Sequence, residues 1–160
     1  MKSITALRQA VVAMNETASK MRFDKDVGTI GNRLLGVRGW KLYSKEFPVL
    51  DVGFQAEGRT ELRVRLVATN WNDEPPSVEL LDKDGNYLTG PNIPQNSGSV
   101  FHADNHHLTG RPFVCMAGAR EYHTHQNHVG DSWDNYKRRG GYDLGGIVTQ
   151  LWKVWQKCNP

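Results

Sequence analysis

The chain has 160 residues, of which 38% are hydrophobic and 23% are charged, and its net charge is +3. This length and balance predict one globular domain that spans residues 1–160. No apolar run approaches bilayer length and the N-terminus lacks the apolar region of a signal peptide, so neither a membrane protein nor a membrane partner is expected. The absence of a Lys/Arg block argues against a nucleic-acid partner. Two distant cysteines and four methionines suit a reducing interior, and we expect a cytoplasmic protein.

The first predicted element is an amphipathic helix over residues 3–21. Its apolar residues recur at three-and-four spacing, which puts them on one stripe: Ile4, Leu7, Val11, Met14, Ala18 and Met21. Ser3 is a suitable N-cap, because its hydroxyl can accept a hydrogen bond from a first-turn amide. We expect the stripe to face a core.

Short strands follow a glycine-rich stretch, residues 28–39, in which no element is predicted. Strands are expected at residues 40–44, 50–55, 62–69 and 78–81, and the third has the alternation of a half-buried antiparallel strand. A proline break at Pro48 and turns at residues 57–60 and 82–85 separate or end them. Because no helix intervenes, we predict an antiparallel meander of about four strands with one face covered.

After the meander the chain is polar and irregular until its last element. Residues 90–99 predict a flap, since they are rich in Pro, Asn, Gly and Ser, and residues 131–142 predict a second irregular segment. Apolar residues return at helical spacing over residues 143–157, with Asp143 as a suitable N-cap. The sequence therefore predicts an α+β fold: an N-terminal helix, the meander, a polar flap bearing a cysteine, and a C-terminal helix.

Cys115 is the strongest candidate for a catalytic residue. It follows a histidine-rich segment and a glycine, Asn105-His106-His107-Leu108-Thr109-Gly110. A thiol on a flap can be reached by large partners, and its thiolate is the reactive form. Asn105, His106 and His107 are candidates to stabilise an oxyanion or to relay a proton. The alternatives are a cysteine that packs as a small hydrophobe and histidines that are merely solvated.

A second group of histidines follows the cysteine. His123, His125 and His128, together with Asp131, offer donors that suit zinc or another transition metal. The spacing of the zinc proteases is absent, because no histidine pair four residues apart encloses a glutamate. The alternative is a polar loop whose histidines hydrogen-bond locally or line the thiol site.

The order of these landmarks resembles the ubiquitin-conjugating enzyme family, in particular its divergent bacterial relatives. The segment Pro75-Pro76-Ser77-Val78-Glu79-Leu80 is similar to the family's Pro-Pro-x-Val-x-Phe. The spacing of His106, His107, Gly110 and Val114-Cys115 is similar to that of its His-Pro-Asn flap and Ile-Cys or Leu-Cys pair. Trp133 and the last helix stand where the family has a tryptophan and helices. The chain departs from the family in lacking His-Pro-Asn itself and in the extra histidines at residues 123–128.

The resemblance implies a conjugating enzyme. Cys115 would accept the C-terminal glycine of a ubiquitin-like protein as a thioester from an adenylating enzyme and pass it to an amine. His107 stands closest to the position of the family's asparagine. No cofactor of its own is implied, because the activating partner consumes the ATP; an associated JAB-type metallopeptidase and a role in antiphage defence are further implications. Two alternatives stay open: a non-catalytic metal-binding or scaffold protein on the same fold, and a Cys-dependent thioester hydrolase.

Overall fold

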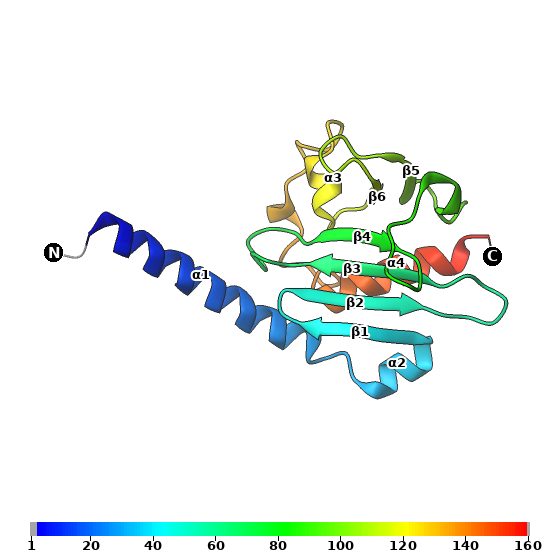
Figure 1. The fold of residues 1–160 in the computed structure, drawn as a ribbon, viewed down its shortest axis with the longest axis horizontal. Coiled ribbons are helices and arrows are strands. Elements are labelled where there is room, and N and C mark those ends of the chain that lie inside the picture. The colour runs from blue at the N-terminus through cyan, green and yellow to red at the C-terminus, as the bar shows by residue number, and fades with distance from the viewer. Residues whose placement is uncertain (1–2, 160) are drawn as a thin grey trace.

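Four antiparallel strands, adjacent in chain order, form the centre of the structure, a computed structural model that describes residues 3–159 (Figure 1). They are β1 (Trp40–Glu46), β2 (Val49–Phe54), β3 (Leu62–Val67) and β4 (Ser77–Leu81). Helix α1 (Ile4–Val27) precedes the sheet and helix α4 (Leu144–Lys157) ends the fold. The predicted α+β layout is therefore confirmed: an N-terminal helix, a four-stranded meander and a C-terminal helix.

One face of the sheet packs against α4 to form the core. Strand β3 alternates buried and half-buried residues, and its inward residues pair with inward residues of β2, as Leu66 does with Leu50 and Val64 with Val52. Helix α4 lies behind the sheet in Figure 1 and buries its apolar stripe against it. Asp143 caps this helix as predicted, because its carboxylate accepts a hydrogen bond of 2.6 Å from the Gly146 amide.

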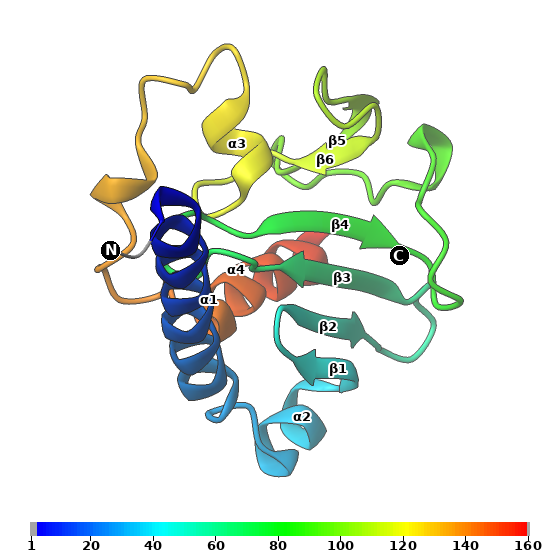
Figure 2. The same ribbon diagram turned by 60° about the vertical axis from the view of Figure 1, so that its left-hand side comes forward.

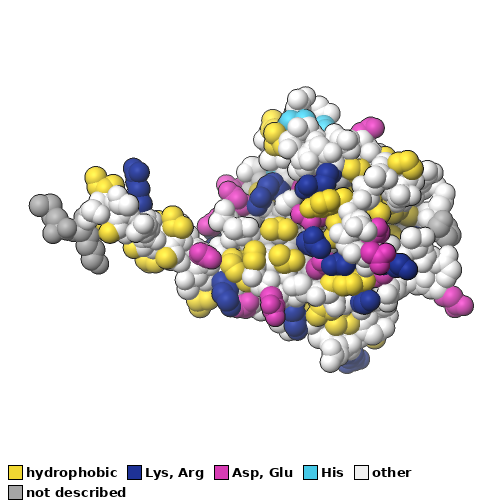
Figure 3. All heavy atoms as spheres, viewed as in Figure 1, with side chains coloured by type: hydrophobic (Ala, Val, Ile, Leu, Met, Phe, Trp, Pro, Cys, Tyr) yellow, Lys and Arg dark blue, Asp and Glu magenta, His cyan; other side chains and the backbone are white. Residues whose placement is uncertain are grey.

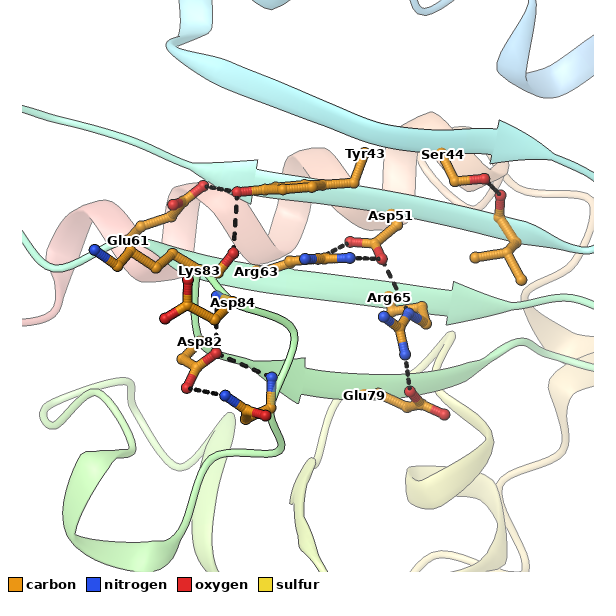
Figure 4. A network of polar contacts seen from close by, with 12 residues as sticks. Tyr43, Ser44, Asp51, Glu61, Arg63, Arg65, Glu79, Asp82, Lys83 and Asp84 are labelled. Carbon is orange, nitrogen blue, oxygen red and sulfur yellow. Dashed lines mark hydrogen bonds and ion pairs between the residues drawn. The ribbon is translucent and has the colours of Figure 1, made fainter.

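The other face of the sheet is open and carries a charged network (Figure 4). Asp51 on β2 is 2% exposed and accepts two hydrogen bonds from Arg63, of 2.7 and 2.8 Å, and one from Arg65, of 2.9 Å. Arg65 also contacts Glu79 on β4 at 3.3 Å. The register makes this possible, because Asp51 pairs with Arg65 and Arg65 with Glu79 across neighbouring strands.

Helix α1 is present, but its environment differs from the prediction. Ser3 caps it, as expected, by accepting a hydrogen bond from the Ala6 amide. The helix extends to Val27, and its N-terminal part projects from the body of the protein (Figures 1 and 2). The buried residues of α1 are Ser19, Phe23 and Val27. The expectation that the apolar stripe faces a core was wrong, because most of its members are exposed to solvent.

The structure also contains short elements that the sequence did not predict. Helix α2 (Asn32–Arg38) lies within the glycine-rich stretch, and two 3₁₀ turns (Gly90–Asn92 and Trp133–Asn135) lie within the irregular segments. Strands β5 (Phe101–Asn105) and β6 (Pro112–Val114) form a hairpin, and helix α3 (Arg120–Thr124) follows it. Among residues 3–159, no helix has the length and apolar content needed to span a lipid bilayer.

Candidate functional site

Cys115 directly follows β6, at one end of the β5–β6 hairpin. The hairpin pairs Phe101 with Val114, and the Cys115 amide continues this pairing by donating to the Val100 carbonyl at 2.8 Å. The side chain is half-buried, so the thiol is neither on an open flap nor deep in the core. Residues 115–119 connect β6 to α3, and we call them the thiol loop.

Helix α3 ties the thiol loop to the Pro-Pro segment before β4. The Arg120 amide donates to the Pro76 carbonyl at 2.8 Å, and the Arg120 guanidinium donates to the Pro75 carbonyl at 3.2 Å. Prolines have no amide hydrogen and cannot donate, but their carbonyls are available as acceptors. The two landmarks of the sequence, the double proline and the cysteine, are thus joined through the first residue of α3.

A buried carboxylate makes the second connection between α3 and β4. Glu121 is 4% exposed and accepts hydrogen bonds from the Ser77 hydroxyl, at 2.5 Å, and from the Val78 amide, at 3.1 and 3.2 Å. Burial raises the pKa of Glu121, although the hydrogen bonds from Ser77 and Val78 oppose the shift. No sequence pattern pointed to this residue, because it lies in a polar stretch and its partners are more than forty positions away.

The far side of the thiol loop is held by a histidine. The Gly118 amide donates to Nε2 of His123 at 3.1 Å, so the ring proton lies on Nδ1, which donates to the Asp131 carbonyl at 2.7 Å. Gly118 has φ of +101°, a conformation that favours glycine. The Asp131 carboxylate in turn accepts from the hydroxyls of Tyr122, at 2.7 Å, and Tyr136, at 2.6 Å. This network fixes the backbone just beyond the cysteine.

Two backbone amides after the cysteine have no acceptor among the residues that the structure describes. Within residues 3–159, the N–H groups of Met116 and Ala117 donate no hydrogen bond to protein, whereas those of Cys115, Gly118 and Ala119 all do. An unpaired amide next to a nucleophile is a suitable donor to negative charge on a carbonyl oxygen. Sequence reasoning missed these groups because it considered side chains alone.

Electrostatics keep the Cys115 thiol protonated at rest. Burial raises the pKa of Cys115 above its ordinary value of 9.0. Among the residues that the structure describes, none makes a hydrogen bond to its sulfur that would favour the thiolate. The pKa of the Tyr122 hydroxyl is raised, mainly by its hydrogen bond to Asp131. Ionisation of Cys115 would raise the Tyr122 pKa further.

We expect iodoacetamide to alkylate Cys115 in the folded protein at a rate that rises about tenfold per pH unit from neutral pH to beyond pH ~9, because only the thiolate reacts. Cys158 serves as the internal control: it is 5% exposed and its S–H donates to the Val154 carbonyl. It should stay unmodified until the protein unfolds. Mass spectrometry of quenched samples measures both sites. A Cys115 rate that reaches a plateau below pH ~8 would contradict the raised pKa.

The histidines predicted to assist Cys115 lie at the other end of the hairpin. Asn105 pairs with Pro112, three residues before the cysteine, which is about 10 Å along a strand. Asn105 and His107 are exposed at the hairpin turn. His106 is buried and occupied at both nitrogens: Nδ1 accepts from the Leu108 amide at 3.1 Å, and Nε2 donates to the Glu121 carbonyl at 3.0 Å. Burial lowers the pKa of His106, so the ring stays neutral at pH 7.

The three histidines proposed as metal ligands do not form one cluster, although the rings of His125 and His128 are neighbours, with centroids 5.7 Å apart. His123 uses both ring nitrogens within the thiol-loop network. His125 lies beside Phe113, with ring centroids 5.6 Å apart, and His128 stacks on Tyr122 at 4.3 Å. Within residues 3–159, no group of three or more His, Cys, Asp or Glu is arranged to hold a metal ion. The arrangement of these side chains therefore does not support zinc binding, which stays a prediction.

Fold and site together define an α+β protein in which a half-buried thiol lies beside the edge of an antiparallel meander. Residues 93–158 match the model of the Y4jH-like family, described as the Y4jH family. Over 46 residues, 29% of this chain, the sequence is 41% identical to an uncharacterized protein, y4jH, of Sinorhizobium fredii. That stretch is 22% of the relative's length. The family match includes Cys115 and all six histidines, but not the meander.

Proposed function

We propose that this protein is a ubiquitin-conjugating-like acyltransferase that carries a ubiquitin-like protein as a thioester on Cys115. The observation that carries the proposal is the partly accessible Cys115 thiol followed directly by two backbone amides without acceptors, at Met116 and Ala117. The chain order of helix, antiparallel meander, Pro-Pro segment and cysteine, which resembles that family, supports it.

The proposed reaction has two transfers. The Cys115 thiolate attacks the thioester carbonyl that links the modifier's C-terminal glycine to an adenylating enzyme, and the enzyme's thiolate leaves. An acceptor amine then attacks the new thioester, loses a proton to solvent or a base, and expels the Cys115 thiolate. Both steps pass through a tetrahedral oxyanion, and each needs a donor near the carbonyl oxygen.

The amides of Met116 and Ala117 are our candidates for that donor, ahead of the side chains of Asn105 and His107. The amides adjoin the sulfur in the chain, whereas the hairpin turn lies about 10 Å away along β6. The hydrogen bonds of Arg120 and His123, on either side of the thiol loop, hold the backbone that carries these amides. Donors that are already in position need no reorganisation during the reaction, and such donors stabilise an oxyanion effectively.

The two alternatives receive less support from the geometry. A Cys-dependent hydrolase needs a base bonded to its thiol, and within residues 3–159 no imidazole contacts the Cys115 sulfur by a hydrogen bond. A conjugating enzyme tolerates a protonated resting thiol, because its partner can complete activation in the complex. A non-catalytic scaffold does not need an accessible thiol at all.

The test is to incubate the protein with ATP and pairs of adenylating enzymes and ubiquitin-like proteins from the same genome. A covalent adduct that reductant removes, absent in Cys115→Ala and retained in Cys158→Ser, is the expected result. Cys115→Ser should give an adduct that resists reductant, because an ester replaces the thioester. An adduct that persists in Cys115→Ala would refute the proposal. Turnover of a model thioester without any partner would favour the hydrolase instead.

A further inference from the structure

The N-terminal part of α1 has no covering element in the structure. Before Ser19 none of its residues is buried, and the helix projects from the body with apolar side chains in view (Figure 3). A helical segment of this length, without tertiary packing, is marginal in water. Its exposed large residues include Ile4, Leu7, Val11, Met14 and Met21, between 52% and 72% exposed. Both facts indicate that a partner covers this surface.

The pattern of these residues is that of a two-stranded coiled coil. Together with Ala18, these residues are spaced alternately three and four positions apart from Ile4 to Met21, which is the spacing of the narrow a/d seam of a coiled coil. The β-branched residues Ile4 and Val11 occupy a positions, and Leu7 and Met14 occupy d positions. In parallel coiled coils, β-branched residues at a with Leu at d favour two strands over three or four.

The body of the protein leaves this seam free. The residues that α1 buries against its own chain are Ser19, Phe23 and Val27. At 3.6 residues per turn they lie roughly 110–170° around the helix from the centre of the seam. The large residues of the seam, from Ile4 to Met21, are therefore left exposed to a second helix.

We propose that α1 pairs in parallel with α1 of a second copy of this chain. At roughly 60–120 Å² for each aliphatic side chain, five from each helix amount to roughly 600–1,200 Å², and the upper end of this range reaches the lower bound for a specific interface. The flanking positions also allow it. In a parallel pair Ala10 faces Asn15 and Thr17 faces Arg22, so no like charges meet.

Two adjacent valines provide the test. Val11 lies on the seam and Val12 lies off it, and both are exposed, at 56% and 65%. In sedimentation equilibrium the full chain should have twice its 18.1 kDa mass. Val11→Glu should raise the dissociation constant about a hundredfold or more, because two unpaired carboxylates enter the seam, whereas Val12→Glu should leave it within about threefold. Near-ultraviolet circular dichroism checks that the folded body is unchanged.

The orientation is tested by a disulfide. In a Cys115→Ser, Cys158→Ser background, Leu7→Cys should cross-link on oxidation, because a parallel pair brings the two positions together. An antiparallel pair would separate them by roughly 16 Å along the axis and prevent the bond. The proposal is overturned if the chain is monomeric at about 100 µM, if Val12→Glu dissociates it as strongly as Val11→Glu, or if no cross-link forms.

Discussion

Replacing Asp51 with asparagine should lower the free energy of unfolding by about 3 kcal/mol, because it leaves two arginines without their shared partner. Asp51 is buried between Arg63 and Arg65, whose side chains are 13% and 28% exposed. The bonds to Arg63 involve both carboxylate oxygens, a bidentate geometry that an amide cannot reproduce. For a domain of this size the loss corresponds to a melting temperature lower by roughly 6–12 °C.

Urea or thermal unfolding monitored by tryptophan fluorescence measures the change. Asp24→Asn is the matched control, because the same substitution there removes an exposed pair between Lys20 and Asp24 within α1. Exposed pairs contribute little, so the control should lose less than about 0.5 kcal/mol. Equal losses for Asp51→Asn and Asp24→Asn would mean that the network on the open face of the sheet does not stabilise the fold.

Removing the Glu121 carboxyl should destabilise the protein by a similar amount and loosen the thiol loop. Glu121→Ala leaves the Val78 amide and the Ser77 hydroxyl without their acceptor, at a cost of about 1–3 kcal/mol for each buried group. We expect a total near 3 kcal/mol and faster alkylation of Cys115. Glu121→Gln keeps an oxygen acceptor for Val78 and should lose less than about 1 kcal/mol.

The difference in unfolding free energy between the wild type and Glu121→Gln should depend on pH. Because burial raises the folded-state pKa of Glu121 above its unfolded value of 4.5, the native state holds the proton more tightly than the unfolded state. The resulting stabilisation is complete below pH 4.5 and is lost as the pH rises through the raised pKa. The stability of the wild type relative to Glu121→Gln should therefore fall with increasing pH. A difference that stays flat or grows would contradict the raised pKa.

The sequence was most informative where periodicity extends over several residues. The alternation of Leu62, Val64 and Leu66 identified β3 and its buried face, and the caps at Ser3 and Asp143 marked helix starts that the structure confirms. Elements of three to five residues, such as β6 and α3, are too short to have a period. The spacing in α1 correctly grouped its apolar residues, but spacing alone does not tell which molecule covers them.

The candidate site was predicted only in part. The cysteine was predicted on a polar flap within reach of large partners, whereas it is half-buried and directly follows β6. His106 was taken for a residue available to chemistry, but its burial and its bond to the Glu121 carbonyl depend on contacts fifteen positions away. Glu121 itself and the free amides of Met116 and Ala117 have no side-chain signature in a single sequence. Long-range burial and backbone hydrogen bonding were the missing information in each case.

Helix α3 has five residues, fewer than a helix needs to persist by itself. Its order therefore depends on residues outside it, among them the carbonyls and donors of residues 75–78. We therefore expect the thiol loop and β4 to open as one cooperative unit, so that amide protons in both exchange with solvent through a shared subglobal transition. In that case the local stability of β4 controls how readily the Cys115 thiol reacts.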